Sequence, residues 1–93
     1  MFEWDADKAA GNFRKHGVRF EFAVAVFDDP RRIESDVSRA QDGELRSKTV
    51  GRIGNKLFAV VFTMRGAVRR IISARRTSAA EDKRYADHSQ NQG

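Results

Sequence analysis

The feature that most constrains the fold is a two-residue turn signal between two strand-like runs. Residues 46–53 alternate polar and apolar side chains, Gly54-Asn55 follows, and residues 57–64 are apolar on both faces. A Gly-Asn pair between such runs is typical of a tight β-hairpin. Such a hairpin would place Arg46 opposite Thr63, Lys48 opposite Val61 and Arg52 opposite Leu57.

Capping and turn residues divide the rest of the chain into short elements. Asp5 is a suitable N-cap for a helix that runs to about Lys15, and Gly17 follows as a stop signal. Ser78 and Glu81 have the spacing of a capping box, which would open a helix through about Ala86. The other predicted elements are a first strand at Met1–Trp4, a second helix at Phe20–Phe27 (with a strand as the alternative), a turn at Asp28–Pro30, an edge strand over residues 31–38, a turn at Arg65–Ala67 and a strand at Val68–Arg75.

This order of elements predicts an α+β domain, a small antiparallel β-sheet meander with two N-terminal helices and one C-terminal helix packed on it. A chain of 93 residues makes one core, so residues 1–86 are expected to form a single domain and the polar residues 87–93 a disordered tail. The absence of Cys and the presence of only two His argue against disulfides and a zinc site. We therefore expect no metal and no cofactor. The apolar runs are too short for the ~20 residues of a membrane span, so a cytoplasmic protein is expected.

Charge is distributed unevenly along the chain. Residues 1–44 carry seven basic and ten acidic side chains, whereas residues 45–93 carry eleven basic and three acidic ones. Eight of those eleven are arginines, whose planar guanidinium matches phosphate oxygens with paired hydrogen bonds. The second half therefore favours a polyanion or an acidic protein as partner, with a solvated basic surface as the alternative.

Strand alternation collects much of this charge on one side of the predicted sheet. Arg46, Lys48 and Arg52 project to one face, and the apolar side chains of Ile53, Phe58, Val60 and Phe62 project to the other, which the helices should cover. The last strand has two possible registers. Pairing Met64 with Val68 adds Arg69 and Arg75 to the basic face and Ile72 and Ala74 to the core, whereas a one-residue slip places Arg70 on the basic face instead.

Such a face suits RNA cleavage without a metal, in which the 2′-hydroxyl attacks the neighbouring phosphate. This reaction needs help with deprotonation, cations for the pentacoordinate phosphate and a donor for the leaving oxygen. His16 is a candidate base, Glu44 can orient arginines and Tyr85 can donate a proton or stack on a base. Structural roles remain open for each of them: His16 as a cation at a helix C-terminus, Glu81 as a capping residue and Tyr85 as a core residue.

A set of short motifs, in a constant order, extends over nearly the whole chain. They are Phe2-Glu-Trp-Asp5, Lys15-His-Gly-Val18, Phe27-Asp-Asp-Pro30, Glu44-x-Arg46, Thr63-x-Arg65, Arg70-Ile-Ile-Ser-Ala-Arg75 and Glu81-x-x-x-Tyr85. In these motifs the chain resembles the BrnT family of toxins from type II toxin–antitoxin pairs. The segment Arg76-Thr-Ser-Ala-Ala80 departs from the basic helix start that is frequent in the family.

The resemblance implies a RelE-like ribonuclease fold and metal-independent RNA cleavage that blocks translation. It also implies a cognate BrnA-like antitoxin with a ribbon-helix-helix part, and operator DNA bound only through the toxin–antitoxin complex. The catalytic candidates that match family motifs are Arg65, Arg75, Arg46, His16, Glu44 and Tyr85. The substrate-binding candidates are Lys15, Lys48, Arg52, Arg69 and Arg70. A non-catalytic basic module that docks an acidic antitoxin or nucleic acid is the alternative function.

Overall fold

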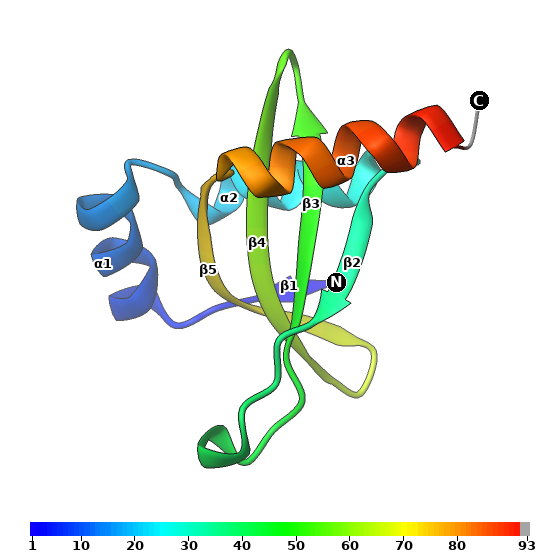
Figure 1. The fold of residues 1–93 in the computed structure, drawn as a ribbon. Coiled ribbons are helices and arrows are strands. Elements are labelled where there is room, and N and C mark those ends of the chain that lie inside the picture. The colour runs from blue at the N-terminus through cyan, green and yellow to red at the C-terminus, as the bar shows by residue number, and fades with distance from the viewer. Residues whose placement is uncertain (92–93) are drawn as a thin grey trace.

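The computed structural model describes residues 1–91, in which one five-stranded sheet carries helices on both of its faces (Figure 1). The strand order across the sheet is β1-β5-β4-β3-β2. In chain order the elements are β1 (Phe2–Glu3), α1 (Ala6–His16), α2 (Phe20–Ala23), the 3₁₀ helix η1 (Val24–Asp28), β2 (Ile33–Asp36), the 3₁₀ helix η2 (Ala40–Asp42), β3 (Ser47–Ile53), β4 (Lys56–Arg65), β5 (Val68–Arg76) and α3 (Ala79–Asn91). The predicted α+β class is confirmed. Across residues 1–91, no helix combines the length and apolar character needed to cross a membrane.

The hairpin predicted around Gly54-Asn55 is present between β3 and β4 with the expected register. Arg52 lies opposite Leu57 and Lys48 opposite Val61, and Gly54 adopts a φ of 64° in the turn. That positive φ is accessible to glycine without steric cost, which explains why a two-residue connection closes here. The predicted edge strand is also confirmed, because β2 pairs antiparallel with β3 at the border of the sheet.

The last strand combines the two registers that the sequence left open. The β4–β5 turn contains two residues rather than the predicted three, so Arg65 rather than Met64 lies opposite Val68. A bulge then shifts the register: Phe62 pairs with Ile71, but the preceding residue of β4, Val61, pairs with Ser73. The extra residue, Ile72, is the reason that neither simple register holds along the whole strand.

The sheet is mixed rather than purely antiparallel, which corrects the predicted meander. Strands β2 to β5 form the antiparallel meander, but β1 adds to its far edge parallel to β5, with Phe2 opposite Arg69 and Glu3 opposite Arg70. This first strand was expected from the apolar opening of the chain. Its partner could not be predicted, since parallel pairing depends on the path of the intervening helices.

The first helix begins and ends where the sequence predicts. The Asp5 carboxylate accepts hydrogen bonds from the backbone N–H groups of Asp7 and Lys8, and Gly17 ends the helix with a φ of 71°. The second helix is shorter than the predicted Phe20–Phe27, because after four α-helical residues the chain tightens into η1. The predicted segment is therefore helical throughout, but its second part is a 3₁₀ helix instead of an α-helix.

Two apolar clusters lie on opposite sides of the sheet. The larger one includes Phe20, Val26, Phe62 and Ile71 and lies between the sheet and the segment from α1 to η1. The smaller one joins Val50 and Ala59 of the sheet to Tyr85 of α3. The expectation that all helices cover one face is therefore wrong. Figure 1 shows α3 in front of β3 and β4, and α2 behind them. We call the side with α3 the α3 face.

The C-terminal helix starts as predicted and runs further than predicted. Ser78 and Glu81 exchange the two hydrogen bonds of a capping box, Ser78 N–H to Glu81 Oε1 at 2.9 Å and Glu81 N–H to Ser78 Oγ at 3.2 Å. The helix continues to Asn91 instead of ending near Ala86. Most of the expected tail, residues 87–93, is therefore helical, and residues 92 and 93 lie outside the described part of the chain.

Candidate nucleic-acid interface

The register gathers five basic side chains on the α3 face. Lys48, Arg70 and Arg75 pair with alternate residues of β4, so their side chains leave the same side of the sheet. Arg46, two residues before Lys48, and Arg65, the last residue of β4, follow the same alternation. We call these five residues the cation row. Arg70 and Arg75 are five positions apart, which in a regular strand would place them on opposite faces. The extra residue Ile72 in the bulge brings both to the same face.

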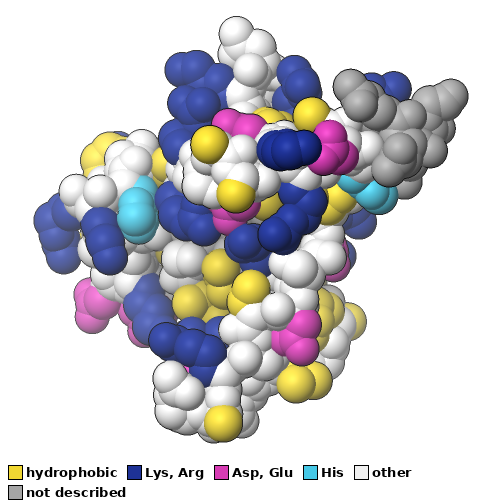
Figure 2. Space-filling model, in the orientation of Figure 1, with side chains coloured by type: hydrophobic (Ala, Val, Ile, Leu, Met, Phe, Trp, Pro, Cys, Tyr) yellow, Lys and Arg dark blue, Asp and Glu magenta, His cyan; other side chains and the backbone are white. Residues whose placement is uncertain are grey.

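Apolar side chains lie between these cations. Val61 pairs with both Lys48 and Ser73, so it lies between them on the α3 face. Ile72 lies next to Ser73 in the bulge, and the side chains of Val61 and Ile72 are both half-buried. Figure 2 shows a hollow below α3 with hydrophobic side chains at its bottom and Lys and Arg side chains around it. A surface that combines backbone-binding cations with apolar contact is suited to a single-stranded nucleic acid.

Glu81 holds two members of the cation row in place. Its carboxylate accepts two hydrogen bonds from Arg75, at 2.8 and 2.9 Å, and one from Lys48 Nζ at 2.7 Å. The Glu81 side chain is only 7% exposed. The Arg75 hydrogen bonds, helped by Lys48 and the Ser78 N–H, outweigh burial and hold the pKa of Glu81 far below its usual range. The pKa of Arg75 rises in turn, mainly through the same hydrogen bonds. Both side chains are thus oriented before any ligand binds.

The other members of the row have weaker partners or none. Arg46 contacts the Glu44 carboxylate at 3.2 Å and Asp42 at 3.5 Å in the loop before β3. Arg70 donates to Glu3 of β1 at 2.6 Å. Arg65 is exposed, and no carboxylate within residues 1–91 forms an ion pair with it. Arg65 is therefore the cation that is most available to an anionic ligand.

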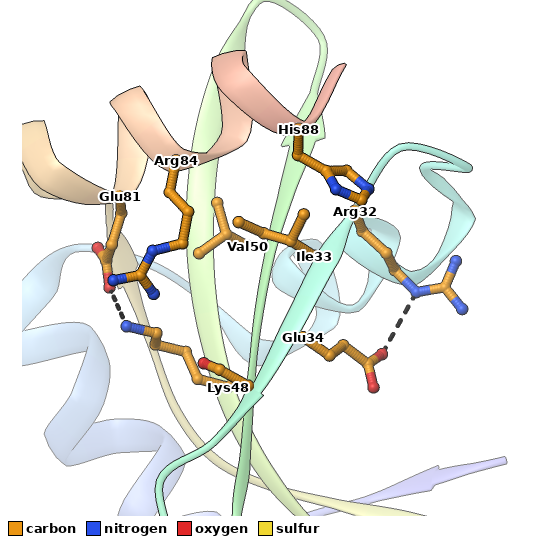
Figure 3. A pocket seen from close by; sticks show the side chains of 9 residues that line it. Arg32, Ile33, Glu34, Lys48, Val50, Glu81, Arg84 and His88 are labelled. Carbon is orange, nitrogen blue, oxygen red and sulfur yellow. Dashed lines mark hydrogen bonds and ion pairs between the residues drawn. The ribbon is translucent and has the colours of Figure 1, made fainter. Parts of the chain in front are cut away.

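A cleft borders the cation row where α3 passes over β2 and β3 (Figure 3). Lys48 and Glu81 belong to both the row and the cleft, joined by their ion pair. Its remaining lining residues are Arg32, Ile33, Glu34, Ser35, Val50, Arg84 and His88. The cleft is therefore continuous with the surface that carries the clamped cations.

Comparison with known families identifies the chain. A family model described as "Ribonuclease toxin, BrnT, of type II toxin-antitoxin system" matches residues 4–81. The chain belongs to the BrnT family. Membership of this family indicates a ribonuclease toxin with a cognate antitoxin, as the motifs in the sequence predicted. No match was found among the curated proteins.

Lys15 and His16, two of the candidate residues, lie at the end of α1 and away from the cation row. His16 is the last residue of α1, and Lys15 beside it is exposed. His16 lines a separate groove with Phe22, Phe58 and Arg76, and Phe58 belongs to the larger core on the opposite side of the sheet. The structure therefore does not bring His16 and the cation row together.

Tyr85 is held in the smaller core by a specific hydrogen bond. Its side chain is buried, and its hydroxyl donates to Asp29 at 2.6 Å. Burial raises the pKa of Tyr85, and the bond to Asp29 raises it further. Arg52 lies beside the ring, and its backbone N–H donates to the same carboxylate at 2.8 Å. Arg52 and Tyr85 line a pocket with Asp82, so α3 separates them from the Lys48 cleft.

Arg69 lies on the core side of the sheet, contrary to the prediction for the three-residue turn. Its guanidinium lies 4.3 Å from the centre of the Phe27 ring and 5.6 Å from that of Phe62. This contact follows from the shorter turn, which places Arg69 opposite Met64. Arg69 contributes to packing by a cation–π contact rather than to the cation row.

The sequence contains a signal for the cleft that the prediction missed. Glu81, Arg84 and His88 have i, i+3, i+7 spacing, which places them on one side of α3. That spacing was overlooked because the helix was expected to end near Ala86. Among the described residues, no group of three or more His, Asp or Glu is arranged to hold a metal ion.

Proposed function

We propose that this BrnT toxin is an endoribonuclease that cleaves RNA on the cation row without a metal ion. The observation that carries the proposal is the pair of preoriented cations: one buried carboxylate, Glu81, holds Arg75 and Lys48 beside an apolar floor. A site for phosphoryl transfer needs positive charge fixed in advance, because donors that are already oriented need not reorganise during the reaction. We also propose a relation in fold to the RelE-like ribonucleases, which the antiparallel meander of β2 to β5 with its packed helices supports.

In the proposed reaction the RNA supplies its own nucleophile. The 2′-oxygen attacks the adjacent phosphorus, the bond to the 5′-oxygen of the next nucleotide breaks, and a 2′,3′-cyclic phosphate and a 5′-hydroxyl result. The proton lost from the 2′-hydroxyl passes to solvent, and the 5′-oxygen gains one. Arg75 and Lys48 neutralise the phosphate oxygens in the transition state, and Arg65 and Arg46 bind neighbouring phosphates.

Metal independence follows from assigning the charge neutralisation to arginine and lysine. Guanidinium and ammonium groups stabilise the same developing charge that a divalent ion would stabilise. Cutting cellular RNA in the cytoplasm would then arrest translation. We keep His16 and Tyr85 outside this catalytic set because they line other parts of the molecule.

We further propose that a ribbon-helix-helix antitoxin neutralises the toxin. An acidic segment of such a partner would compete with RNA for the cation row, since both present negative charge to the same side chains. Operator DNA would then be bound by the complex through the antitoxin. The reading frame next to this gene should encode that small protein, and its co-expression should relieve growth arrest.

The test is cleavage of single-stranded RNA by the purified chain in the presence of EDTA. We expect cyclic phosphate ends and a rate that falls about 10²-fold or more in Arg75→Ala, the loss typical of one oriented donor. Arg65→Ala should weaken RNA binding without unfolding the exposed strand end. Arg14→Ala on α1 is the matched control, because it removes an exposed arginine far from the row.

Three results would count against the proposal. RNA that is bound but never cut would favour the alternative, a non-catalytic binding module. Activity that disappears with EDTA and returns with Mg²⁺ would refute metal independence. An Arg75→Ala variant that folds by circular dichroism and cuts at the parental rate would remove the cation row from the catalytic site.

A further inference from the structure

We propose that the cleft between α3 and the β2–β3 pair binds one nucleobase of the RNA and so sets the base preference of cleavage. The inference rests on the proposed function for its RNA substrate, but its first test does not require cleavage. The cleft has a volume of ≈ 330 Å³, at the lower end of small-molecule clefts. It therefore suits a single planar ring system better than an extended segment of a partner.

The walls of the cleft come from two directions. On the sheet side, Ile33 pairs with Val50 and Ser35 pairs with Lys48, so an apolar pair lies beside a polar one. On the helix side, Glu81, Arg84 and His88 lie on successive turns of α3 (Figure 3). A slot with an apolar floor and polar groups along its walls fits a heterocycle that stacks with its faces and hydrogen-bonds with its edges.

The charges in the cleft favour a neutral base over a phosphate. Its two carboxylates, Glu34 and Glu81, offset two of the three lining cations, so the cleft is much less positive than the cation row. Glu81 is already occupied by Arg75, Lys48 and the start of α3. A phosphate is accommodated better outside, at the cation row, where Arg65 has no competing carboxylate partner among residues 1–91.

Hydrogen-bonding capacity remains at the border of the cleft. Arg32 and Glu34 alternate with Ile33 and Ser35 along β2, so their side chains point away from α3, and the Arg32 Nε is buried without a hydrogen-bond partner within the described residues. Its nearest carboxylate oxygen, on Glu34, lies 3.5 Å away, which is an ion pair without a good hydrogen bond. Arg84 extends from α3 toward Lys48 across the cleft (Figure 3). The Arg84 guanidinium can hydrogen-bond to the edge of a nucleobase or stack on its face.

The position of Lys48 connects the two binding sites. Lys48 belongs to the cation row through its register and to the cleft as a lining residue. A nucleotide whose phosphate contacts the row can therefore place its own or its neighbour's base in the cleft. The cleft would determine which base lies beside the scissile bond, and the row would bind any sequence.

Binding of the four nucleoside 5′-monophosphates, measured by calorimetry and by NMR of the backbone amides, tests the inference. We expect at least one of them to bind about tenfold or more tightly than ribose 5-phosphate, with amide shifts at Val50 and Arg84. Arg84→Ala should remove most of that advantage, because it deletes the side chain that crosses the cleft. Lys83→Ala is the matched control, since Lys83 is exposed on the same helix, pairs with Asp87 and does not line the cleft.

Cleavage then separates this inference from the proposed function. On RNA oligonucleotides that differ at one position beside the cut, we expect Arg84→Ala to reduce the difference in rate between the four bases, whereas Lys83→Ala should keep the parental difference. Equal binding of ribose 5-phosphate and the monophosphates would overturn the inference, even if the protein cuts RNA. So would a cleft that ignores all four monophosphates and is covered by the antitoxin. No cleavage by any variant, with base-dependent binding intact, would refute the proposed function alone.

Discussion

Glu81 offers a direct test of how the cation row is held in place, because one carboxylate connects α3, β3 and β5. Replacing it by glutamine keeps the size of the side chain and one carbonyl oxygen. The amide can still accept from the Ser78 N–H, but it loses the charge that binds Arg75 and Lys48. The substitution therefore removes the ion pairs of Glu81 and keeps its hydrogen bond in the capping box, so its effect on stability measures the ion pairs alone.

The expected magnitude follows from the exposure of the three side chains. Breaking a fully buried ion pair by removing one partner costs about 3–5 kcal/mol. Glu81 is 7% exposed, but Lys48 is 17% and Arg75 36% exposed, so water recovers part of the loss. We expect Glu81→Gln to lower the free energy of unfolding by about 2–3 kcal/mol at pH 7. In a domain of this size that corresponds to a fall in Tm of roughly 10–15 °C.

The effect should depend on pH in a defined direction. The pKa of Glu81 is lowered in the folded state from its ordinary value of 4.5, so the unfolded chain takes up the proton first as the pH falls. The stabilisation is therefore complete above about pH 5.5 and decreases progressively below pH 4.5. The difference between the parent and Glu81→Gln should shrink over that range, because glutamine does not titrate.

Urea unfolding followed by circular dichroism at pH 7, 5, 4 and 3 measures both effects. Glu34→Gln is the control: its pair with Arg32 is 3.5 Å long and both side chains are partly exposed, so it should cost less than about 0.5 kcal/mol. If the unfolding free energy of Glu81→Gln lies within about 0.5 kcal/mol of the parent at pH 7, the ion pairs of Glu81 do not stabilise the fold as argued. A difference that stays constant down to pH 3 would show that the charge of Glu81 is not its source.

Three further substitutions test other parts of the fold. Gly51→Ala should lower the unfolding free energy by about 2 kcal/mol in urea titrations, because the new methyl carbon would lie 2.8 Å from the Val26 carbonyl oxygen. Asn12→Asp should cost about 3 kcal/mol at pH 7 and less at pH 3, since the buried amide donates to two carbonyl groups that a carboxylate would repel. Tyr85→Phe should lower the Tm by about 5–10 °C through loss of the hydrogen bond to Asp29, and equal melting curves would contradict that role.

The elements with local signals could be predicted from the sequence. Asp5 and Gly17 bound α1, Gly54-Asn55 closes the hairpin, and Ser78 with Glu81 opens α3, because each depends on neighbouring residues alone. The hairpin register in turn placed Lys48 correctly on the basic face. The apolar face of the sheet followed from the same alternation.

What could not be predicted depends on contacts between distant segments. The sequence Arg65-Gly66-Ala67 is compatible with a turn of two or three residues, and no local sequence signal marks the bulge at Ile72. The side of the sheet that α3 covers depends on the burial of Tyr85 against residues far from it in the chain. Glu81 was recognised as a capping residue, but its contacts with Lys48 and Arg75 required the strands to be in place.

The bulge in β5 has a consequence for changes in chain length. Arg70 and Arg75 are separated by an odd number of positions, so in a regular strand they would point to opposite sides. Ile72 is the extra residue in the bulge. Its removal would restore regular pairing and leave all remaining side chains of β5 on their present sides. Deleting any other single residue between the two arginines would give the same even spacing, but a different side chain would then take the place of the deleted residue. A one-residue deletion at Ile72 should therefore preserve the cation row, while flattening the sheet that the bulge now twists beneath α3.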